Sequence, residues 1–355
     1  MNQTPYEMGF QMPAEWHPHQ ATQLHWPSNR ETWPGERLTK AEEVCLNIIE
    51  SLHRFEPVML LVDPGAYRHA NKRLGERNLD GRRVHVFKQP LNDMWARDCG
   101  PIFIRRQTEA GDVFAITDWK YNAWGGKYPP YEEDNRLPKW FAEEFQIPYI
   151  QVDMVLEGGA IDSNGEGVLL TTESVLLNPN RNPEMNREEI ARYLRDYLGV
   201  KKIIWLKNGL AGDDTDGHVD DLARFLNVDT ILAVTVEDPG NVNYEALQTN
   251  FKILKQASGL NGRPFHIETL PLPETRIQGT TVDGSSFVPA SYANFYIANE
   301  VVLVPLYEDP NDQAAMNLFQ RYFPNRKVIG IPCSDLVWGQ GSIHCVTQQL
   351  YPCLR

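Results

Sequence analysis

A recurring pairing of short apolar stretches with amphipathic helical patterns most constrains the fold of this chain. In five regions, apolar residues recur three to four positions apart, as on one face of an α-helix. Short apolar stretches typical of strands accompany them, so we expect an α/β fold of five supersecondary units. No residue pattern repeats at a fixed period, so a propeller, a barrel and an open sheet all stay open. The expected helices cover residues 38–55, 137–145, 186–199, 244–254 and 315–322, and the expected strands 58–62, 168–170, 231–236, 301–306 and 328–331.

The third of these helices carries signals for both of its ends. Asn186 offers a side-chain acceptor ahead of the first turn, and Glu189 stands three residues later, as in a capping box. Gly199 follows the last apolar position of the pattern and favours the left-handed conformation that ends a helix. The sequence therefore predicts a helix that begins after Asn186 and stops at Gly199.

Nothing in the sequence divides the chain into separate units. Its 355 residues contain no Gly/Ser linker, no low-complexity tract and no long run of charge. A single domain of α/β class can reach this size around one continuous core. We therefore expect one domain over residues 1–355, and the sequence leaves open whether it forms a homo-oligomer.

The charge balance bears on partners and location. The chain has 34 Lys and Arg against 47 Asp and Glu, a net charge of −13, which repels nucleic acid and anionic membranes and mildly attracts cations. The first residues show neither a basic n-region nor an apolar h-region. The longest apolar stretches, such as 58–62 and 301–304, are too short to span a bilayer. We expect a cytoplasmic protein that binds neither nucleic acid nor membranes.

The cysteines indicate a free thiol rather than a disulfide framework or a zinc site. There are five, at positions 45, 99, 333, 345 and 353, and no two of them form a CxxC pair. His17 and His19 are the only closely spaced histidines, and Pro18 between them favours a structural role. We expect a protein without a metal or a cofactor.

Four segments combine glycine-flanked turns with reactive side chains, and such turns expose a side chain at the end of a strand. In the third segment, an extended chain from Gly217 onward would place His218 and Asp220 on the same face, because side chains alternate with period two. A calcium loop is excluded there, since Gly212 and Ala223 would stand where the first and last carboxylates are required. The four segments cover residues 95–101, 156–159, 212–221 and 339–349.

Taken one at a time, the side chains in these turns allow a structural role as well as a chemical one. Asp98 could cap its turn by accepting from nearby backbone, or it could face a flat cation beside an aromatic side chain. Glu157 could be an exposed turn residue, and Cys345 a small and inert core residue. The aromatic loop 122–130 is typical of a surface Ω-loop or of a lid over a site.

The order of these segments resembles the agmatine deiminase family, within the guanidine-modifying enzymes that share a five-bladed α/β propeller, the pentein fold. The resemblance implies that Cys345 is the nucleophile and His218 the general acid/base, with Glu157 as its partner at the substrate. It also implies that Asp98 and Asp220 clamp the guanidinium. The residues that carry it are 12–16, 95–98, 122–126, 157–159, 215–220 and 343–349.

The resemblance further implies hydrolysis of agmatine to N-carbamoylputrescine and ammonia through a covalent amidino-cysteine intermediate. A planar guanidinium offers N–H donors in a fork, which two carboxylates hold bidentately. We expect Trp95 to pack on the methylene chain, and Asp214 or Asp216 to hold the distal amine or to support the His218 turn. A peptidyl-arginine deiminase, which converts protein arginine to citrulline, is the alternative with the same guanidinium chemistry. A metal-dependent hydrolase and a non-catalytic polyamine-binding protein are alternatives of other classes.

Overall fold

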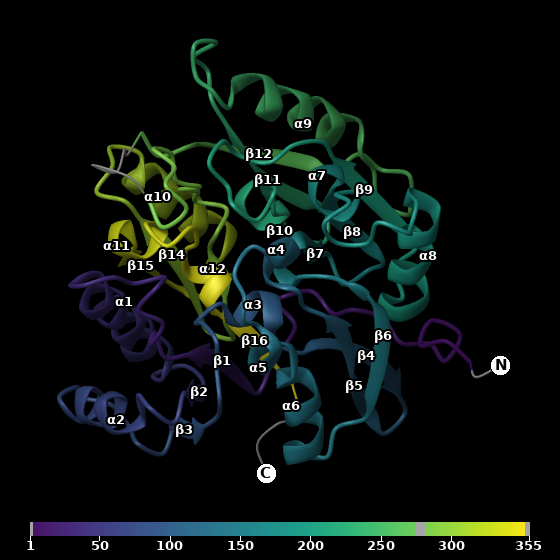
Figure 1. Cartoon of the computed structure of the whole chain (residues 1–355). Coiled ribbons are helices and arrows are strands. Elements are labelled where there is room, and N and C mark those ends of the chain that lie inside the picture. Colours follow the sequence, from purple (N-terminus) through teal and green to yellow (C-terminus); the bar gives the residue numbers. More distant parts are fainter. Residues whose placement is uncertain (1–2, 275–280, 352–355) are drawn as a thin grey trace.

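The chain forms five separate β-sheets with helices packed beside them (Figure 1). The computed structural model describes residues 3–274 and 281–351. In each three-stranded sheet, the first two strands pair antiparallel and the second and third pair parallel. Parallel neighbours need a crossover connection, and in each of these sheets a helix supplies it. The α/β class expected from the sequence is therefore confirmed.

The four three-stranded sheets follow one another along the chain, and each uses one long helix as its crossover. The first has β4 (Ile102–Thr108), β5 (Gly111–Lys120) and β6 (Tyr149–Val155) with α6 (Leu137–Phe145). The second has β7 (Ile161–Ser163), β8 (Val168–Thr172) and β9 (Lys202–Leu206) with α8 (Arg187–Leu198). The third has β10 (Ala223–Asn227), β11 (Thr230–Thr235) and β12 (His266–Pro271) with α9 (Tyr244–Gln256). The fourth has β13 (Tyr296–Ile297), β14 (Val301–Leu306) and β15 (Lys327–Pro332) with α10 (Asp312–Tyr322).

The four-stranded sheet joins the two ends of the chain, because β16 (Gln348–Leu350) pairs antiparallel with β1 (Ala21–His25). Strands β1, β2 (Val58–Val62) and β3 (Val84–Lys88) then pair in parallel, with α1 (Arg37–Leu52) and α2 (Tyr67–Gly75) as their crossovers. The remaining helices are short and lie between these elements. They are α3 (Ala96–Cys99), α4 (Ala123–Gly126), α5 (Glu132–Asn135), η1 (Gly158–Ala160), α7 (Glu173–Leu176), η2 (Val219–Asp221), α11 (Ser334–Val337) and α12 (Ile343–Val346).

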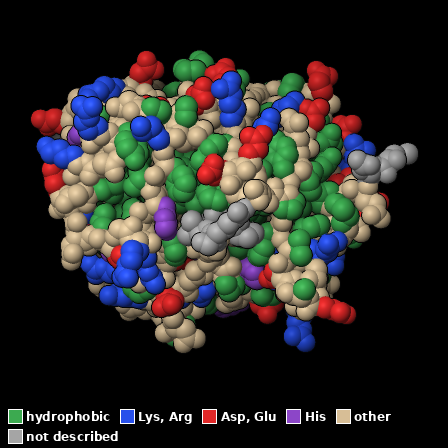
Figure 2. Space-filling model, turned by 90° about the horizontal axis from the view of Figure 1, so that it is seen from below, with side chains coloured by type: hydrophobic (Ala, Val, Ile, Leu, Met, Phe, Trp, Pro, Cys, Tyr) green, Lys and Arg blue, Asp and Glu red, His purple; other side chains and the backbone are tan. Residues whose placement is uncertain are grey.

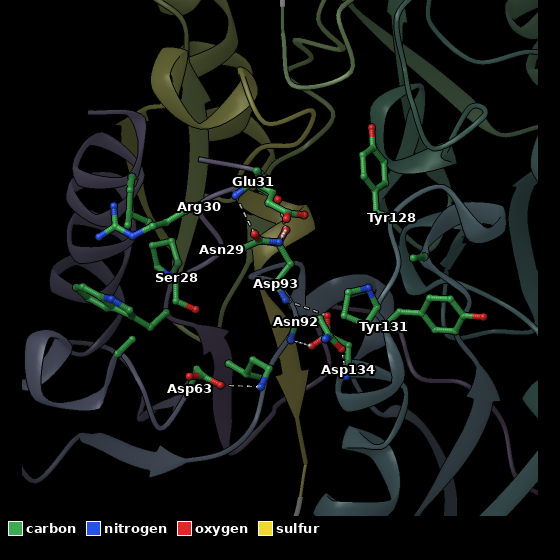
Figure 3. Close-up of a pocket in the computed structure, with 18 of the residues that line it drawn as sticks. Ser28, Asn29, Arg30, Glu31, Asp63, Asn92, Asp93, Tyr128, Tyr131 and Asp134 are labelled. Carbon is green, nitrogen blue, oxygen red and sulfur yellow. Dashed lines mark hydrogen bonds between the residues drawn. The ribbon is translucent and has the colours of Figure 1, made fainter. Parts of the chain in front are cut away.

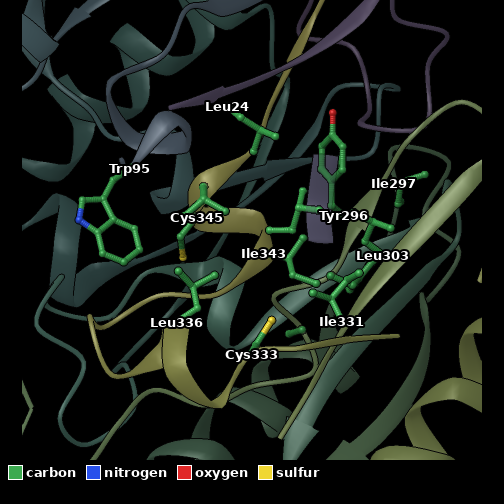
Figure 4. Close-up of a cluster of buried hydrophobic side chains, with 14 of the residues drawn as sticks. Leu24, Trp95, Tyr296, Ile297, Leu303, Ile331, Cys333, Leu336, Ile343 and Cys345 are labelled. Carbon is green, nitrogen blue, oxygen red and sulfur yellow. The ribbon is translucent and has the colours of Figure 1, made fainter. Parts of the chain in front are cut away.

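The core lies between the sheets and their helices. Every residue of β2 and of β8 is buried, as are the first five residues of β11 and β14. Strands buried on both faces read as near-continuous apolar runs, which is why these four stretches were visible in the sequence. Figure 4 shows one part of this core, where Ile343 and Leu336 pack beside Cys345.

All five helices expected from the sequence are confirmed. The five expected strands, however, do not fall one to each sheet. Strands β14 and β15, both expected, are neighbours in the same sheet. The sheet of β4, β5 and β6 contains no strand expected from the sequence. Strand β5 is exposed over its first three residues and mixes charged with apolar side chains, so it lacks the apolar run that marks a fully buried strand.

The surface gives no structural sign of a membrane span. Within the described residues, no helix combines the length and the apolar character that a bilayer crossing requires. On the face seen from below in Figure 2, acidic and basic side chains are interspersed rather than gathered by sign. The net charge of −13 is therefore not concentrated in one patch of that face.

Helix α8 has the ends that the sequence predicts. The Asn186 side chain accepts from the Glu189 backbone N–H at 3.1 Å, and the Glu189 carboxylate accepts from the Asn186 N–H at 2.8 Å. Gly199 ends the helix with a φ of 67°, in the left-handed region that glycine adopts without strain.

We expect Asn186→Ala to lower the free energy of unfolding by about 1 kcal/mol, because it removes the side-chain acceptor of the capping box. Urea unfolding of the purified protein measures this loss. Glu184→Ala is the matched control, since this exposed residue stands just outside the helix and should change stability by less than about 0.5 kcal/mol. Equal losses in the two variants would contradict the capping role of Asn186.

Candidate active site

Five short turns, one ahead of the first strand of each sheet, meet at one place. Turn α3 precedes β4, η1 precedes β7, η2 precedes β10, residues 291–294 precede β13, and α12 precedes β16. Turn α3 contacts both α12 and η1, and η1 contacts η2. The Ser291 hydroxyl donates to the Asp221 carbonyl at 2.7 Å, and the Asn294 side chain accepts from the His344 N–H at 2.9 Å. The five turns therefore form a ring of contacts.

Three of the predicted site residues converge on one glycine of this ring. A Cβ atom placed on Gly159 would lie 2.6 Å from His218 Nδ1, 2.7 Å from Asp98 Oδ1 and 3.2 Å from Asp220 Oδ2. The Gly159 N–H donates to Asp98 Oδ1 at 2.9 Å, and His218 Nδ1 lies 3.7 Å from the same oxygen. Only a residue without a side chain fits here, so the histidine and both carboxylates pack around the backbone of Gly159.

Two sequence-based expectations about this cluster are wrong in their geometry. His218 and Asp220 do not alternate along an extended chain, because residues Val219–Asp221 form one turn of 3₁₀-helix. Asp98 does not cap its own turn, because its carboxylate accepts from the Gly159 N–H and from the Trp124 indole N–H at 2.9 Å. Tertiary contacts, rather than local spacing, bring these groups together.

Cys345 lies in α12 and is held by an asparagine that the sequence did not single out. The Asn294 Nδ2 group donates to Cys345 Sγ at 3.2 Å and to Asp221 Oδ1 at 2.9 Å. Its Oδ1 atom accepts from the backbone N–H of both His344 and Cys345. The Asn294 amide thus fixes the turn that carries the thiol and donates to its sulfur. The signal that would have found it is its place ahead of β13, equivalent to the turns ahead of the other sheets.

The Cys345 sulfur lies 3.9 Å from Asp220 Oδ2 and borders a narrow cavity of about 30 Å³. Trp95, Asp98 and Asp214 line the same cavity, and Trp124 and Asp93 complete its aromatic and acidic walls. Among the described residues that line it, none is Lys, Arg or His. Figure 4 shows the sulfur of Cys345 on the side of α12 that faces Trp95. The charged side chains in its lining are therefore acidic, which favours a cation over an anion.

A wide cleft of about 960 Å³ adjoins this cavity (Figure 3). The two share Asp93, Trp124 and Tyr128 in their walls. The Asp134 carboxylate accepts from the backbone N–H groups of Asn92 and Asp93, which shapes the floor of the cleft. Its walls carry Arg30, Lys127 and His69 as well as five carboxyl groups, and burial raises the pKa of Asp93 to about 6 and that of Asp134 to about 8. The carboxyl groups are those of Glu31, Glu42, Asp63, Asp93 and Asp134.

The loop that contains Trp124 forms a wall of the cavity. Ala123, Trp124 and Gly125 all have positive φ values, and the Asn122 side chain accepts from the Gly125 N–H at 2.9 Å. A left-handed conformation is rare for tryptophan. Here it directs the indole N–H to Asp98, so this segment is a tight turn that belongs to the site.

Burial sets the protonation states of the cluster. Burial raises the pKa of Asp98 to about 7, although the hydrogen bonds that Trp124 and Gly159 donate to its carboxylate act in the opposite direction. Burial, together with Asp98, raises the pKa of Asp220 well above its usual range. Burial and the neighbouring carboxylates likewise raise the pKa of the Cys345 thiol. Without a cation, the site therefore favours a neutral thiol and protonated carboxyls.

His218 and Glu157 supply buried polar atoms that have no partner within the described protein. Both ring nitrogens of His218 lack one, as do Asp220 Oδ1 and Glu157 Oε2. Burial and the positive charge of Arg181 lower the pKa of His218, which favours the neutral imidazole. Glu157 Oε1 accepts from Arg181 Nε at 2.6 Å, and no hydrogen bond joins Glu157 to His218 in the described residues. A planar ligand with several N–H donors would satisfy the acceptors among these atoms.

Asp214 lines the cavity, whereas Asp216 is occupied elsewhere. The Tyr128 hydroxyl donates to Asp214 Oδ2, and Lys127 Nζ lies 3.5 Å from Asp214 Oδ1. Asp216 pairs with Arg181 Nη1 at 2.5 Å and with Lys127 Nζ at 2.9 Å, so it supports the His218 turn. Of the two expectations for these aspartates, contact with a ligand fits Asp214 and support of the turn fits Asp216.

Among the described residues, one group of side chains has ligand atoms close enough to hold a metal ion. Single atoms of Asp220, Asp221 and Cys345 all lie within 4.8 Å of one another. His17 and His19 stand apart from this group, beside Asp112 at 3.2 Å and Glu56 at 3.3 Å respectively. The described cysteines, Cys45, Cys99, Cys333 and Cys345, are free and buried, and Cys353 lies outside the described residues.

Cys345 Sγ lies 3.9 Å from Asp220, and His218 Nδ1 lies 3.7 Å from Asp98; a buried thiol, histidine and carboxylates are a set of groups typical of cysteine hydrolases. The sequence model for the Porphyromonas-type peptidyl-arginine deiminases matches residues 11–351. An agmatine deiminase of Pseudomonas aeruginosa is 36% identical over 98% of this chain and 96% of its own length. The chain therefore belongs to the Porphyromonas-type peptidyl-arginine deiminase family.

Solved structures agree with this assignment. Agmatine deiminase of Enterococcus faecalis superposes with a TM-score of 0.91 at 32% identity, over 99% of this chain and 98% of that one. Agmatine deiminase of C. jejuni superposes with a TM-score of 0.82 at 32% identity, over 98% of this chain and 97% of that one. The similarity covers the elements that carry the five turns.

We expect Gly159→Ala to lower the free energy of unfolding by about 1–3 kcal/mol, because the added methyl forces buried side chains apart. His218 and Asp98 would have to move from positions less than 3 Å from the new atom. Gly75→Ala is the control: no atom lies within 4 Å of its Cβ position at the end of α2, so stability should not fall. Urea unfolding compares the two, and an unchanged stability of Gly159→Ala would contradict the packing described above.

Proposed function

We propose that this protein is an agmatine deiminase, which hydrolyses agmatine to N-carbamoylputrescine and ammonia. The observation that carries the proposal is the position of Cys345 Sγ, 3.9 Å from Asp220 in a cavity whose charged lining residues are aspartates. The relatives of Pseudomonas aeruginosa and Enterococcus faecalis that bear this name support it. Agmatine carries a positive charge at each end, which suits a cavity with acidic groups along its length.

Binding begins with the guanidinium between Asp98 and Asp220. The fork of N–H donors fits carboxylates at its edges, and Asp220 Oδ1 is a buried acceptor without a partner. The cation lowers the pKa of both carboxyls and of the thiol, because it stabilises their charged forms. The thiol proton then passes to the neutral His218, which leaves a thiolate next to the electrophilic carbon.

The first chemical step is attack of Cys345 Sγ on the guanidinium carbon. It forms an S–C bond and a neutral tetrahedral intermediate with three nitrogens. His218 returns its proton to one terminal nitrogen, the C–N bond breaks, and ammonia leaves. The product of this step is a cationic S-alkylthiouronium, and its charge again rests between Asp98 and Asp220.

The second chemical step is hydrolysis of this intermediate. His218, now neutral, takes a proton from water, and the hydroxide attacks the same carbon. The tetrahedral adduct collapses, breaks the C–S bond and expels Cys345 as a thiolate. The new hydroxyl gives its proton to the thiolate, which leaves N-carbamoylputrescine and the thiol. His218 then releases the proton that it took from water to solvent, where the ammonia takes it up, and the imidazole is neutral again. The balance is agmatine plus water to N-carbamoylputrescine plus ammonia, and the steps require no metal or cofactor.

The distal end of agmatine is assigned to the walls of the cavity. Trp95 supplies an apolar surface for the methylene chain, and Asp214 supplies a carboxylate for the terminal ammonium. The Tyr128 hydroxyl holds Asp214 in place through one carboxylate oxygen. An arginyl peptide offers no cation at this point, which favours agmatine over the alternative peptidyl-arginine substrate.

We further propose that the five sheets are the blades of one α/β propeller and that residues 1–355 form a single catalytic domain. The ring of five turns supports this arrangement, since equivalent turns of successive blades meet around a central axis. A cytoplasmic location and the formation of a homo-oligomer stay predictions, which cell fractionation and light scattering would check.

We expect Cys345→Ser to lower kcat/KM for agmatine by at least about a thousandfold, because a serine hydroxyl is a far weaker nucleophile than a thiolate. Release of ammonia and of the ureido product is measured in EDTA with agmatine, free arginine and a blocked arginyl peptide. Cys333→Ser is the control, since this buried thiol lies outside the cavity lining and should leave turnover intact. Substantial turnover by Cys345→Ser, or loss of wild-type activity in EDTA, would refute the mechanism. Preference for the peptide would favour the alternative.

We expect kcat/KM to fall below about pH 7, because protonation of Asp98, with its pKa of about 7, removes one clamp of the cation. Trp124→Phe removes an indole donor that stabilises the carboxylate, so the acid limb should move to higher pH by about one to two units. Trp119→Phe is the matched control, because its buried indole donates to Thr117 at 2.9 Å, outside the cavity lining. If the acid limb of Trp124→Phe lies at the same pH as in the wild type, a group other than Asp98 controls the fall of kcat/KM.

A further inference from the structure

His344 stands directly before the nucleophile, with its side chain between two carboxylates. Its Nδ1 atom lies 2.6 Å from Asp220 Oδ2, and its Nε2 atom lies 2.8 Å from Glu15 Oε2. All three side chains are buried. Glu15 comes from the N-terminal segment, 329 positions before His344. The carboxylate that faces the substrate is therefore linked through a histidine to a second carboxylate behind it.

The charges around Glu15 keep it ionised. Arg224 Nη2 lies 2.9 Å from Glu15 Oε1, and Arg97 Nη2 lies 3.2 Å from Glu15 Oε2. Burial alone would raise the pKa of Glu15, but Arg224, His344 and Arg97 hold it well below its usual range. An ionised carboxylate only accepts hydrogen bonds, so Nε2 of His344 must carry a hydrogen.

The contact on the other side of the ring needs one more proton. A distance of 2.6 Å between Nδ1 and Asp220 Oδ2 requires a hydrogen between them. Either Asp220 is protonated and donates to a neutral His344, or His344 is an imidazolium and donates to an ionised Asp220. Burial raises the pKa of Asp220 and lowers that of His344, which places the shared proton on Asp220 in the free site.

We propose that His344 is a positioning residue that takes up the Asp220 proton when the guanidinium binds, so that Asp220 becomes a carboxylate without releasing a proton to solvent. This inference rests on the function proposed above. The donor at Nδ1 also orients Asp220, leaving its unpartnered Oδ1 for the substrate. Burial, Arg224 and Arg97 lower the pKa of His344, and the negative charge of Glu15 on the far side of the ring opposes them and favours the imidazolium.

The consequence is visible in the pH dependence of kcat/KM. In the wild type, the Asp220–His344 pair holds one proton before and after the guanidinium binds. On the acid side of a plot of log(kcat/KM) against pH, the acid limb, Asp98 is then the only group that must lose a proton, and we expect a slope of one. In His344→Asn, the amide still donates to Asp220 but takes up no proton, and Asp220 must release its proton to solvent. We expect the limb of this variant to steepen to a slope of two, with KM recovering to within about threefold of wild type at high pH.

His19→Asn is the matched control, since His19 is another buried histidine beside a buried carboxylate, 3.3 Å from Glu56 and outside the site. The His19→Asn protein should be less stable than the wild type, while the acid limb of its kcat/KM profile keeps a slope of one. Glu15→Gln is a second test variant, because it removes the charge that favours the imidazolium and should also steepen the limb. A slope of one in both His344→Asn and Glu15→Gln overturns the proposal.

A spectroscopic readout tests the pair without turnover. In the Cys345→Ser protein with isotope-labelled histidine, NMR at pH 8 should show one imidazole with both ring nitrogens protonated when agmatine or a blocked arginyl peptide is bound. Exposed histidines are neutral at that pH. Absence of such an imidazole in the liganded protein overturns the role of His344, even if the wild type converts agmatine. Its presence with the peptide but not with agmatine would support the pair and contradict the proposed substrate.

Discussion

Buried negative charge that needs a cation is the constraint on which this site depends. Asp98, Asp220 and Asp221 lie out of water around one thiol, and burial alone favours their protonated forms. Isolated charges of this kind are costly to bury unless they are paired. A guanidinium supplies the missing charge and several N–H donors at once. In the proposed mechanism, binding of the guanidinium ionises the carboxyls and the thiol, so reactivity depends on the presence of this ligand.

Two buried arginines behind the site offset part of the cost of burying its carboxyl groups. Arg224 is fully buried and bonds Asp162 at 2.8 Å, while its other end lies beside Glu15. Arg97 lies beside Glu15 and donates at 2.8 Å to the side chain of Gln349, which lies in β16 at the edge of the four-stranded sheet. These pairs connect the N-terminal segment with β7, β10, α3 and β16. Removing one partner would leave a buried charge unpaired, which is strongly destabilising.

In the proposed mechanism, one part of the site binds the guanidinium and another part binds the rest of the ligand. Asp98, Asp220, His218 and Cys345 act in this mechanism on a group that agmatine and peptidyl arginine share. In the same proposal, Asp214 in the lining of the narrow cavity selects between these ligands. The wide cleft beyond this cavity has basic as well as acidic side chains in its walls.

The sequence by itself determined the elements whose signals are local. The period of the apolar residues predicted five of the six helices that have nine or more residues in the described part of the chain. It missed α2, which buries only Ala70 and Leu74, whereas Asn186 and Gly199 marked the ends of α8. Glycine-flanked turns singled out Cys345, His218 and Asp98 as candidates, and only the resemblance to a family assigned roles to them. Strand β5 escaped notice, since its partly exposed face carries no apolar run.

Only the tertiary structure decided which turns meet. Gly159 gathers His218 and Asp98 from segments 120 positions apart, Asn294 reaches the thiol across 51 positions, and Glu15 reaches His344 across 329. Contacts of this kind depend on packing between sheets, and no local spacing encodes them.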